Sequence, residues 1–340
     1  MKPNAFLALA ALSVAALIGA ALLWPKQEGV TLYCAVDGAH ALPILDAFER
    51  ETGIHVHHTF DTEANKTVGL VQKLREERGN PRADVFWNNE VMHTIRLGRE
   101  GILAPYDSAA AKDIPFEFRD PVRLWTGFGA RARILIVNTE LVPEDQRPTS
   151  MNDLLDAQWK GRTAFVRPLT GTTLTHAAVL YTMLGNEGAR TWFRGLHTNR
   201  TLFPSGNGPL ARSVAGSQVA FGFTDTDDYE KVLRDGRPVA RVYPDQEDGG
   251  IGTLLIPNTV ALIKDGPRPD LGKQLIDFLL SERVEEMLAH GDSAQIPVRE
   301  SVKRPASVVG PPTFRAMKVD WNDVVDNFDE RLTELEALWR

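Results

Sequence analysis

Short apolar runs alternate with amphipathic segments along most of this 340-residue chain. Runs such as VTLYCAV (30–36) and ADVFWNN (83–89) have the length and composition of buried strands. The segment ALPILDAFERETG (41–53) places apolar residues at helical spacing and ends in glycine, as a helix does. This alternation predicts an α/β protein with largely parallel sheets.

The same pattern continues to the end of the chain. Because a chain of this length exceeds one simple core, we expect two lobes. Further strands are predicted at 54–60, 129–141 and around 256–263, and further helices at 65–80, at 269–291 as one long helix, and from 322 onward. Each early strand ends in a polar loop, which is where open α/β sheets place their ligands.

The N-terminus differs in kind from the rest of the chain. AFLALAALSVAALIGAALLW (5–24) carries no charge and is long enough, at about 1.5 Å per residue, to span a hydrocarbon core of about 30 Å. Trp24 and Lys26 lie where interfacial anchors belong. The run fits a signal sequence that is either cleaved or retained, and its length favours a retained membrane anchor. The remainder is then expected outside the cytoplasm.

Composition excludes several classes of function. The net charge is −7 and charges of both signs are mixed along the chain, so no basic block marks a nucleic-acid surface. The sequence contains no G-x-S-x-G elbow, no H-E-x-x-H and no phosphate-binding glycine loop, which argues against an enzyme. A single cysteine, Cys34, lies inside a predicted strand and is expected to be a small core residue.

Two polar segments follow predicted strands and are candidates for binding chemistry. RPLTGTTLTHAA (167–178) opens a helix with hydroxyls and backbone N–H groups, a natural anion site, although a plain threonine N-cap explains it too. VAFGFTDTDDYEKV (219–232) passes from an apolar strand to three aspartates, which suit a metal, an ammonium group or merely a helix start. The candidate residues are Thr170, Gly171, Thr172, Thr173, Asp225, Asp227 and Asp228.

The ordered set of segments resembles a known family. LYCAVDGAHALPILDAFERETGI, PRADVFWNNE, GARARILIVN, RPLTGTTLTHAAVLY, NGPLARSVAGSQVAFGFTDTDD and IPNTVALIKDGPRPDLGKQLIDFLLS are similar to the type II periplasmic solute-binding proteins of ABC transporters, in the branch with the ferric-iron binders. The resemblance implies two lobes joined by two β crossovers, with solute in the cleft. It divides the chain into a signal or anchor (1–28), lobe one (29–127 plus 257–300), lobe two (128–256) and a C-terminal helical segment (301–340).

The resemblance also implies site residues. It adds Asp37, Lys66, Asn89 and Glu90 to the ligand-binding candidates, with Glu90, Asp227 and Asp228 as candidate metal ligands. Ferric binders grip iron with two adjacent tyrosines at the position of Asp227 and Asp228, whereas Tyr229 follows one residue late. This departure from the family pattern bears directly on which solute is bound.

The functional expectation is an extracytoplasmic solute-binding component of an ABC importer. No cofactor is expected, and a bound metal such as iron(III), with a companion anion, would be cargo. The alternatives are a phosphorylated or aminated organic solute, or a ligand-sensing module in place of transport. Expected partners are a transporter permease, the small ligand and, through the N-terminal helix, a membrane; the protein is expected to be a monomer.

Overall fold

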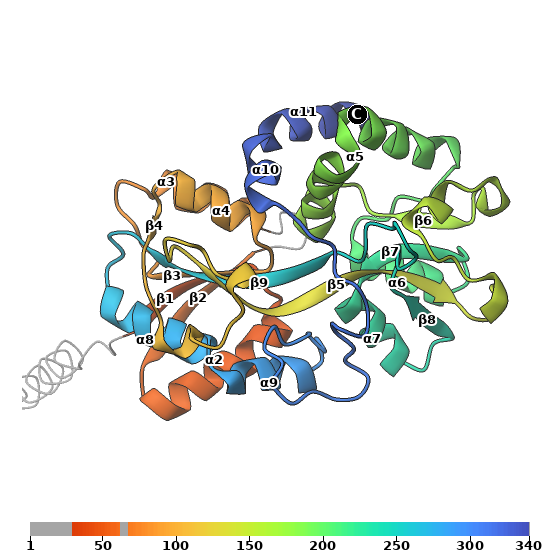
Figure 1. Cartoon of the computed structure of the whole chain (residues 1–340). Helices are drawn as coiled ribbons and strands as arrows, with labels where there is room; N and C mark the ends of the chain where they lie inside the picture. The colour runs from red at the N-terminus through yellow and green to blue at the C-terminus, as the bar shows by residue number, and fades with distance from the viewer. Residues whose placement is uncertain (1–28, 62–66, 340) are drawn as a thin grey trace, which may run out of the picture.

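A computed structural model describes residues 29–61 and 67–339 of the chain. Its strands and helices form two halves, seen at the left and right of Figure 1. The half at the left, here the first lobe, contains β1 (Gly29–Cys34), β2 (His55–Phe60), β3 (Val85–Asn88) and β4 (Leu103–Ala104), with α2 (Gly38–Thr52), α3 (Val68–Glu76), α4 (Met92–Arg99), α8 (Pro269–Leu279) and α9 (Glu282–His290).

The other half, here the second lobe, repeats the arrangement of a sheet covered by helices. It contains β6 (Thr163–Phe165), β7 (Phe221–Asp225) and β8 (Val239–Val242), with α5 (Gly171–Thr198), α6 (Asn207–Ala215) and α7 (Thr226–Arg234). Short 3₁₀ helices occur in the loops of both halves, at η2 (Ala109–Ala111), η3 (Phe116–Phe118), η4 (Glu144–Gln146), η5 (Met151–Leu155) and η6 (Ala157–Trp159).

Two long strands connect the halves. β5 (Thr126–Asn138) pairs with β9 (Leu255–Ile263) through its first residues and with β7 and β8 through its last. β9 continues into the first lobe, where it pairs with β3. The strand order is therefore β2-β1-β3-β9-β5-β7-β6, with β4 on β9 and β8 on β5.

The sheets are mixed and not largely parallel, which corrects the prediction from the sequence. β1 pairs with β2 and β3 in parallel, as β6 does with β7, but every pair that involves β5 or β9 is antiparallel. The reason is topological: β5 leaves the first lobe and β9 returns to it beside β5. Hydrophobic periodicity alone does not distinguish the two directions.

The single long helix predicted at 269–291 is two helices. α8 ends at Leu279 and α9 begins at Glu282, because Ser281 leaves the helical conformation and its hydroxyl accepts a hydrogen bond from the Val284 backbone N–H. This is the behaviour of a serine N-cap, which a continuous apolar periodicity conceals.

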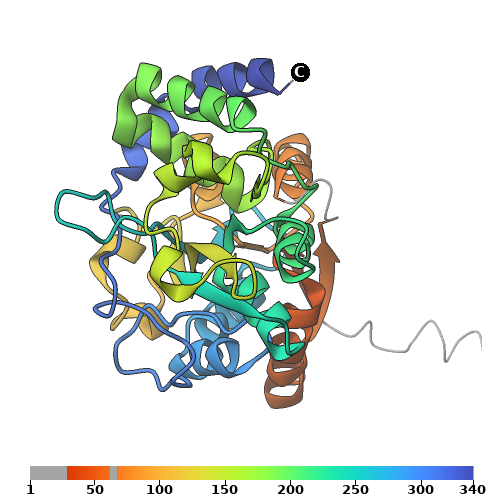
Figure 2. The ribbon, with the colours of Figure 1, turned by 90° about the vertical axis from the view of Figure 1, so that its right-hand side faces the viewer.

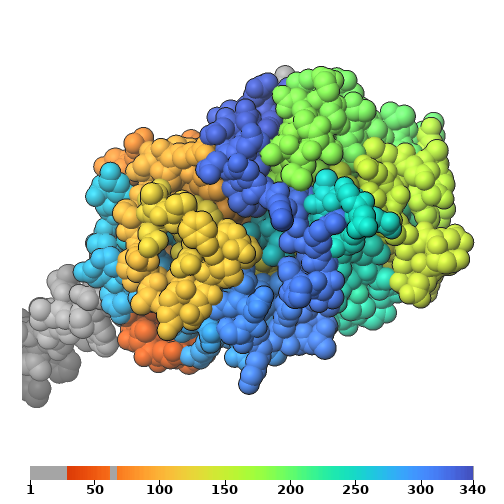
Figure 3. All heavy atoms as spheres, viewed as in Figure 1, coloured from red at the N-terminus to blue at the C-terminus, as the bar shows by residue number. Residues whose placement is uncertain are grey.

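The C-terminal segment makes a third connection between the halves. α10 (Trp321–Asp326) and α11 (Phe328–Leu338) pack on α5, and α10 also packs on α4. Figure 2 shows α11 lying along α5, and in Figure 3 the blue C-terminal atoms cover the junction between the orange and green regions. Asp323 accepts a 2.6 Å hydrogen bond from Thr182 of α5, while Asp329 pairs with Arg96 of α4 at 2.6 Å. One buried apolar cluster accordingly includes residues of both lobes and of these helices.

The N-terminal apolar run lies within residues 1–28, outside the described residues. Within the ranges 29–61 and 67–339, no helix combines the length and apolar character needed to cross a membrane.

A bulge in β5 gives a first prediction. Gly129 has φ +45°, and a Cβ at this position would lie 2.8 Å from Gln295 Oε1 and 2.9 Å from Leu288 Cδ1. We expect Gly129→Ala to lower the free energy of unfolding by about 1–3 kcal/mol, measured by urea denaturation. Gly53→Ala is the matched control, since Gly53 has φ +71° with no atom within 4 Å of its added Cβ. Equal losses in the two variants would exclude a packing contribution at Gly129.

Candidate functional site

A cavity lies between the two lobes and is lined by residues from both. Its volume is about 80 Å³, room for a few waters at roughly 10–15 Å³ each, so it suits a small solute. Asp37 and Asn89 line it from the first lobe and Arg131 from the crossover strand β5. The second lobe supplies Val166, Thr170, Gly171, Thr172, Thr173, Ser205, Gly206, Asn207, Asp225, Asp227 and Asp228.

Most of the residues predicted for the site meet in this cavity. Those that line it are Asp37, Asn89, Thr170, Gly171, Thr172, Thr173, Asp225, Asp227 and Asp228. They meet because the carboxyl ends of β1, β3, β6 and β7 all face the cleft. Lys66 falls in the segment 62–66, outside the described residues.

Glu90 does not reach the cavity. Its side chain is fully buried and is not part of the lining. Its carboxylate accepts hydrogen bonds from the backbone N–H groups of Met92 (2.6 Å) and His93 (3.0 Å) at the start of α4. Burial would raise the pKa of Glu90, but the charge and hydrogen bond of His93, together with Asn88, lower it. These internal partners occupy the oxygens that a metal would need.

The N-terminal ends of α5 and α6 form one wall of the cavity. Neither N-cap, Thr170 for α5 or Gly206 for α6, makes a side-chain capping hydrogen bond. First-turn N–H groups have no acceptor within their own helix, and the helix dipole favours negative charge there. Gly171 has φ +58° with open space around it, so the chain turns into α5 without a side chain that would cover these groups. This wall is suited to bind an anion.

A buried ion pair lies immediately behind that wall. The Arg133 guanidinium, fully buried, donates to Asp225 Oδ1 at 2.7 Å. Asp225 Oδ2 accepts from Thr172 at 2.6 Å and from Asn207 at 2.9 Å. Burial would raise the pKa of Asp225, but Arg133, Arg131 and the Thr172 hydrogen bond lower it below its ordinary value. Asp225 therefore orients the threonine and asparagine that line the cavity.

Arg131 spans the cleft from the crossover strand. It is 5% exposed, donates to the Asn89 carbonyl of the first lobe and lies 4.0 Å from Asp227 of the second. Its Nε has no hydrogen-bond partner among the described residues. A guanidinium that lines a cavity is suited to an anionic ligand.

The cavity is also lined by carboxylates, which could bind a cation. Oxygen atoms of Asp225, Asp227 and Asp228 lie within 4.8 Å of one another, close enough to surround a cation. Asp37 faces the same cavity from the first lobe. Four carboxylates and one guanidinium line the cavity, so its net charge is negative even with Arg133 behind Asp225. An ammonium group or a metal ion is favoured there.

All five tyrosines of the chain are described, and none of them lines the cavity. Tyr229, the residue that follows the aspartates, is 6% exposed and packs in an apolar cluster of the second lobe. Its ring lies 5.4 Å from the Arg241 guanidinium. A pair of tyrosine ligands is therefore not present at this site.

Sequence reasoning did not find Arg131, Arg133, Ser205 or Asn207. The two arginines carried a usable signal, because GARARILIVN places them at alternate positions of an otherwise apolar strand and so on one face. Charges buried in this way require partners, which points to the aspartates. Ser205 and Asn207 carried no signal beyond their position before a helix.

Comparison with known proteins identifies the class. A profile of the family described as bacterial extracellular solute-binding protein matches residues 80–327. The chain belongs to this family, and it is the solute-binding component of an ABC importer with a two-lobe type II fold. The family consists of solute-binding proteins that act outside the cytoplasm with transporter permeases.

Individual relatives differ in what they bind. A putative 2-aminoethylphosphonate-binding periplasmic protein of Salmonella paratyphi A is 29% identical over 304 residues, which cover 86% of this chain and 85% of the relative. Iron uptake protein A1 of Synechocystis is 25% identical over 292 residues, covering 82% and 79%. The crystal structure of iron-bound HitA from Pseudomonas aeruginosa has a TM-score of 0.82 at 24% identity, over 92% of this chain and 99% of that one.

The buried ion pair gives a prediction with a pH dependence. Asp225→Asn leaves Arg133 buried without its counter-charge, so we expect the free energy of unfolding at pH 7 to fall by roughly 3 kcal/mol. The unfolded pKa of aspartate is about 3.9 and that of folded Asp225 is lower. The stabilisation is thus complete above the unfolded pKa and is lost as the pH falls through the folded pKa.

Urea unfolding of wild type and Asp225→Asn, from neutral pH to below about pH 3, measures this effect. The difference between the two proteins should shrink as the pH falls. The exposed Asp145 supplies the control, because Asp145→Asn should follow the wild type at every pH. A difference that stays constant with pH would show that Asp225 is not ionised in the folded protein.

Proposed function

We propose that the protein binds a small organic solute carrying both an anionic group and an ammonium group, of which an aminoalkylphosphonate is the model compound. The observation that carries this proposal is the composition of one cavity, which joins an anion-binding wall to a carboxylate wall. The N-termini of α5 and α6 and the Arg131 side chain line the cavity together with Asp227 and Asp228.

Size and relatives support the same class of solute. A cavity of about 80 Å³ between the lobes favours a small solute. The relative named for 2-aminoethylphosphonate binding is aligned along 86% of this chain. In our proposal the phosphonate oxygens accept from the α5 wall and Arg131, and the ammonium group donates to the aspartates.

A second candidate is iron(III), or another hard metal, with a companion anion. It is favoured by the three carboxylates of Asp225, Asp227 and Asp228 and by the iron-binding relatives. Carboxylate oxygens are suitable ligands for hard cations. Because Asp225 is already paired with Arg133, Asp227 and Asp228 would supply most of the protein ligation.

Selectivity among simple probes tests the first candidate. Isothermal titration of the wild type should show 2-aminoethylphosphonate binding at least about tenfold more tightly than ethylphosphonate, because only the former reaches the aspartates. Asp227→Asn together with Asp228→Asn keeps the shape but removes the charge, and should abolish that preference. A wild type that binds neither phosphonate, or binds both equally, contradicts the proposal.

Titration with iron(III) and citrate tests the second candidate. Uptake by the carboxylates would raise the melting temperature without a visible phenolate charge-transfer band, because the tyrosines lie outside the cavity. Asp227→Asn with Asp228→Asn should remove the shift in melting temperature. A phenolate band in the wild type would contradict this arrangement of ligands.

The remaining expectations complete the proposal. We infer that lobe one comprises 29–127 plus 257–300 and lobe two 128–256, that residues 301–340 form a separate C-terminal segment, and that the protein acts as a monomer. The apolar run at 5–24 is proposed to anchor the protein to the membrane that holds the transporter permease.

A further inference from the structure

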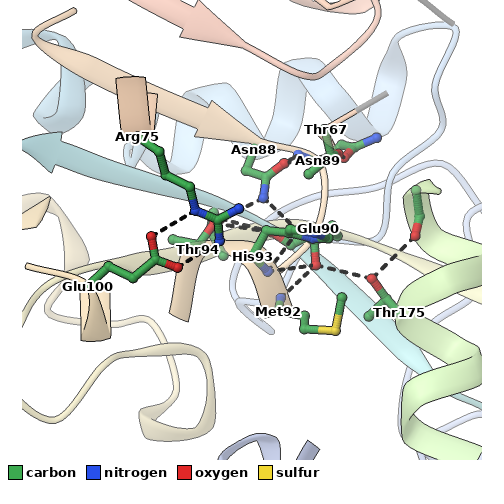
Figure 4. A network of polar contacts seen from close by, with 12 residues as sticks. Thr67, Arg75, Asn88, Asn89, Glu90, Met92, His93, Thr94, Glu100 and Thr175 are labelled. Carbon is green, nitrogen blue, oxygen red and sulfur yellow. Dashed lines mark hydrogen bonds and ion pairs between the residues drawn. The ribbon is translucent and has the colours of Figure 1, made fainter. Parts of the chain in front are cut away.

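A hydrogen bond joins the two lobes at Glu90, whose surroundings are drawn in Figure 4. Glu90 lies between β3 and α4 of the first lobe, and its Oε2 accepts from Thr175 Oγ1 of α5 in the second lobe at 3.1 Å. Both side chains are fully buried. Water therefore cannot replace this contact at low cost.

The other partners of the Glu90 carboxylate belong to its own lobe. Besides the N–H groups of Met92 and His93, Asn88 Nδ2 lies 2.8 Å and His93 Nδ1 3.0 Å from Oε1. Burial opposes ionisation, but the charge and hydrogen bond of His93, with Asn88, lower the pKa of Glu90. The acceptor is thus a carboxylate fixed by the first lobe, and the bond from Thr175 is charge-assisted.

Both ends of the bond lie next to residues that face the solute. Asn89 precedes Glu90 and lines the cavity from the first lobe. Thr172 lies three residues before Thr175, hence on the same side of α5, and lines the cavity from the second lobe. A shift of Thr175 relative to Glu90 would consequently displace one wall of the cavity from the other.

We infer that Glu90 is a positioning residue that, through Thr175, sets the two walls of the solute cavity in their binding-competent arrangement. This inference rests on the proposed solute-binding role of the cavity, and it replaces the metal-ligand role expected for Glu90. The bond contributes to affinity by stabilising the closed arrangement of the lobes, without contact between Glu90 and the solute.

The C-terminal helices explain why loss of the bond should loosen the lobes without unfolding them. Phe328 packs against His93 at a ring distance of 5.6 Å, and the Arg96 guanidinium lies 4.5 Å from the same ring. Arg331 donates to Thr182 of α5 at 2.8 Å. These contacts connect α4 and α5 independently of Thr175.

Two substitutions at Thr175 test the inference. Thr175→Val keeps the shape but removes the hydroxyl, and should weaken binding of 2-aminoethylphosphonate, or of iron(III) citrate, by about tenfold. Thr175→Ser keeps the hydroxyl and should restore affinity to within about threefold of the wild type. The comparison separates the hydrogen bond from general effects of substitution at a buried position.

The arrangement of the lobes is measured in the solute-free protein by the distance between spin labels. Cysteines introduced at exposed Gln72 of α3 and Lys231 of α7 carry the labels, and the native Cys34 is fully buried. Thr175→Val should shift the distribution towards longer distances, whereas Thr175→Ser should not. Wild-type distances and affinity in Thr175→Val would overturn the inference.

The two proposals fail in different ways. If the wild type binds none of the named probes, the proposed function fails, yet the label distances in solute-free Thr175→Val still decide the role of Glu90. If Thr175→Val and Thr175→Ser weaken binding equally with unchanged distances, the solute assignment stands and the positioning role of Glu90 is refuted.

Discussion

Two arginines on a fully buried strand are the constraint on which the site depends. Every residue of β5 is buried, and Arg131 and Arg133 lie on the same face of it. Guanidinium groups stay charged in proteins, so each needs counter-charges and acceptors at once. Asp225 from β7, Asp227 from α7 and the Asn89 carbonyl from the first lobe meet that need. The partners of Arg131 and Arg133 therefore come from both lobes and meet beside β5.

The solute cavity lies beside these buried ion pairs and is lined by some of the same residues, among them Arg131 and Asp225. Arg133 pairs with Asp225 behind the cavity, whereas Arg131 lines it and the carboxylate side retains excess negative charge. Uncapped helix ends supply the complementary positive potential. A ligand with charges of both signs matches that arrangement better than a bare cation does. No tyrosine of the chain, all five being described, lines the cavity, whereas the carboxylates of Asp227 and Asp228 do.

Sequence reasoning named most of the residues that line the cavity, because polar segments that follow apolar strands can be recognised in a sequence. The segments around Thr170 and Asp227 each follow an apolar strand, and parallel strands deliver such segments to one edge of a sheet. The role of Glu90 could not be read in this way. Its family position indicates a ligand, but Met92, His93 and Thr175 occupy its oxygens, and Thr175 is 85 residues away in the sequence. Long-range partners of this kind leave no local pattern.

Local sequence thus determined the elements: apolar runs made β1, β3 and β7, glycine ended α2, and polar residues after strands supplied the site's chemistry. Tertiary structure alone decided that β5 and β9 run antiparallel and which charges pair. The physical reason is that periodicity reports only which face of an element is buried. Strand direction and ion pairing depend on residues brought together from distant parts of the chain.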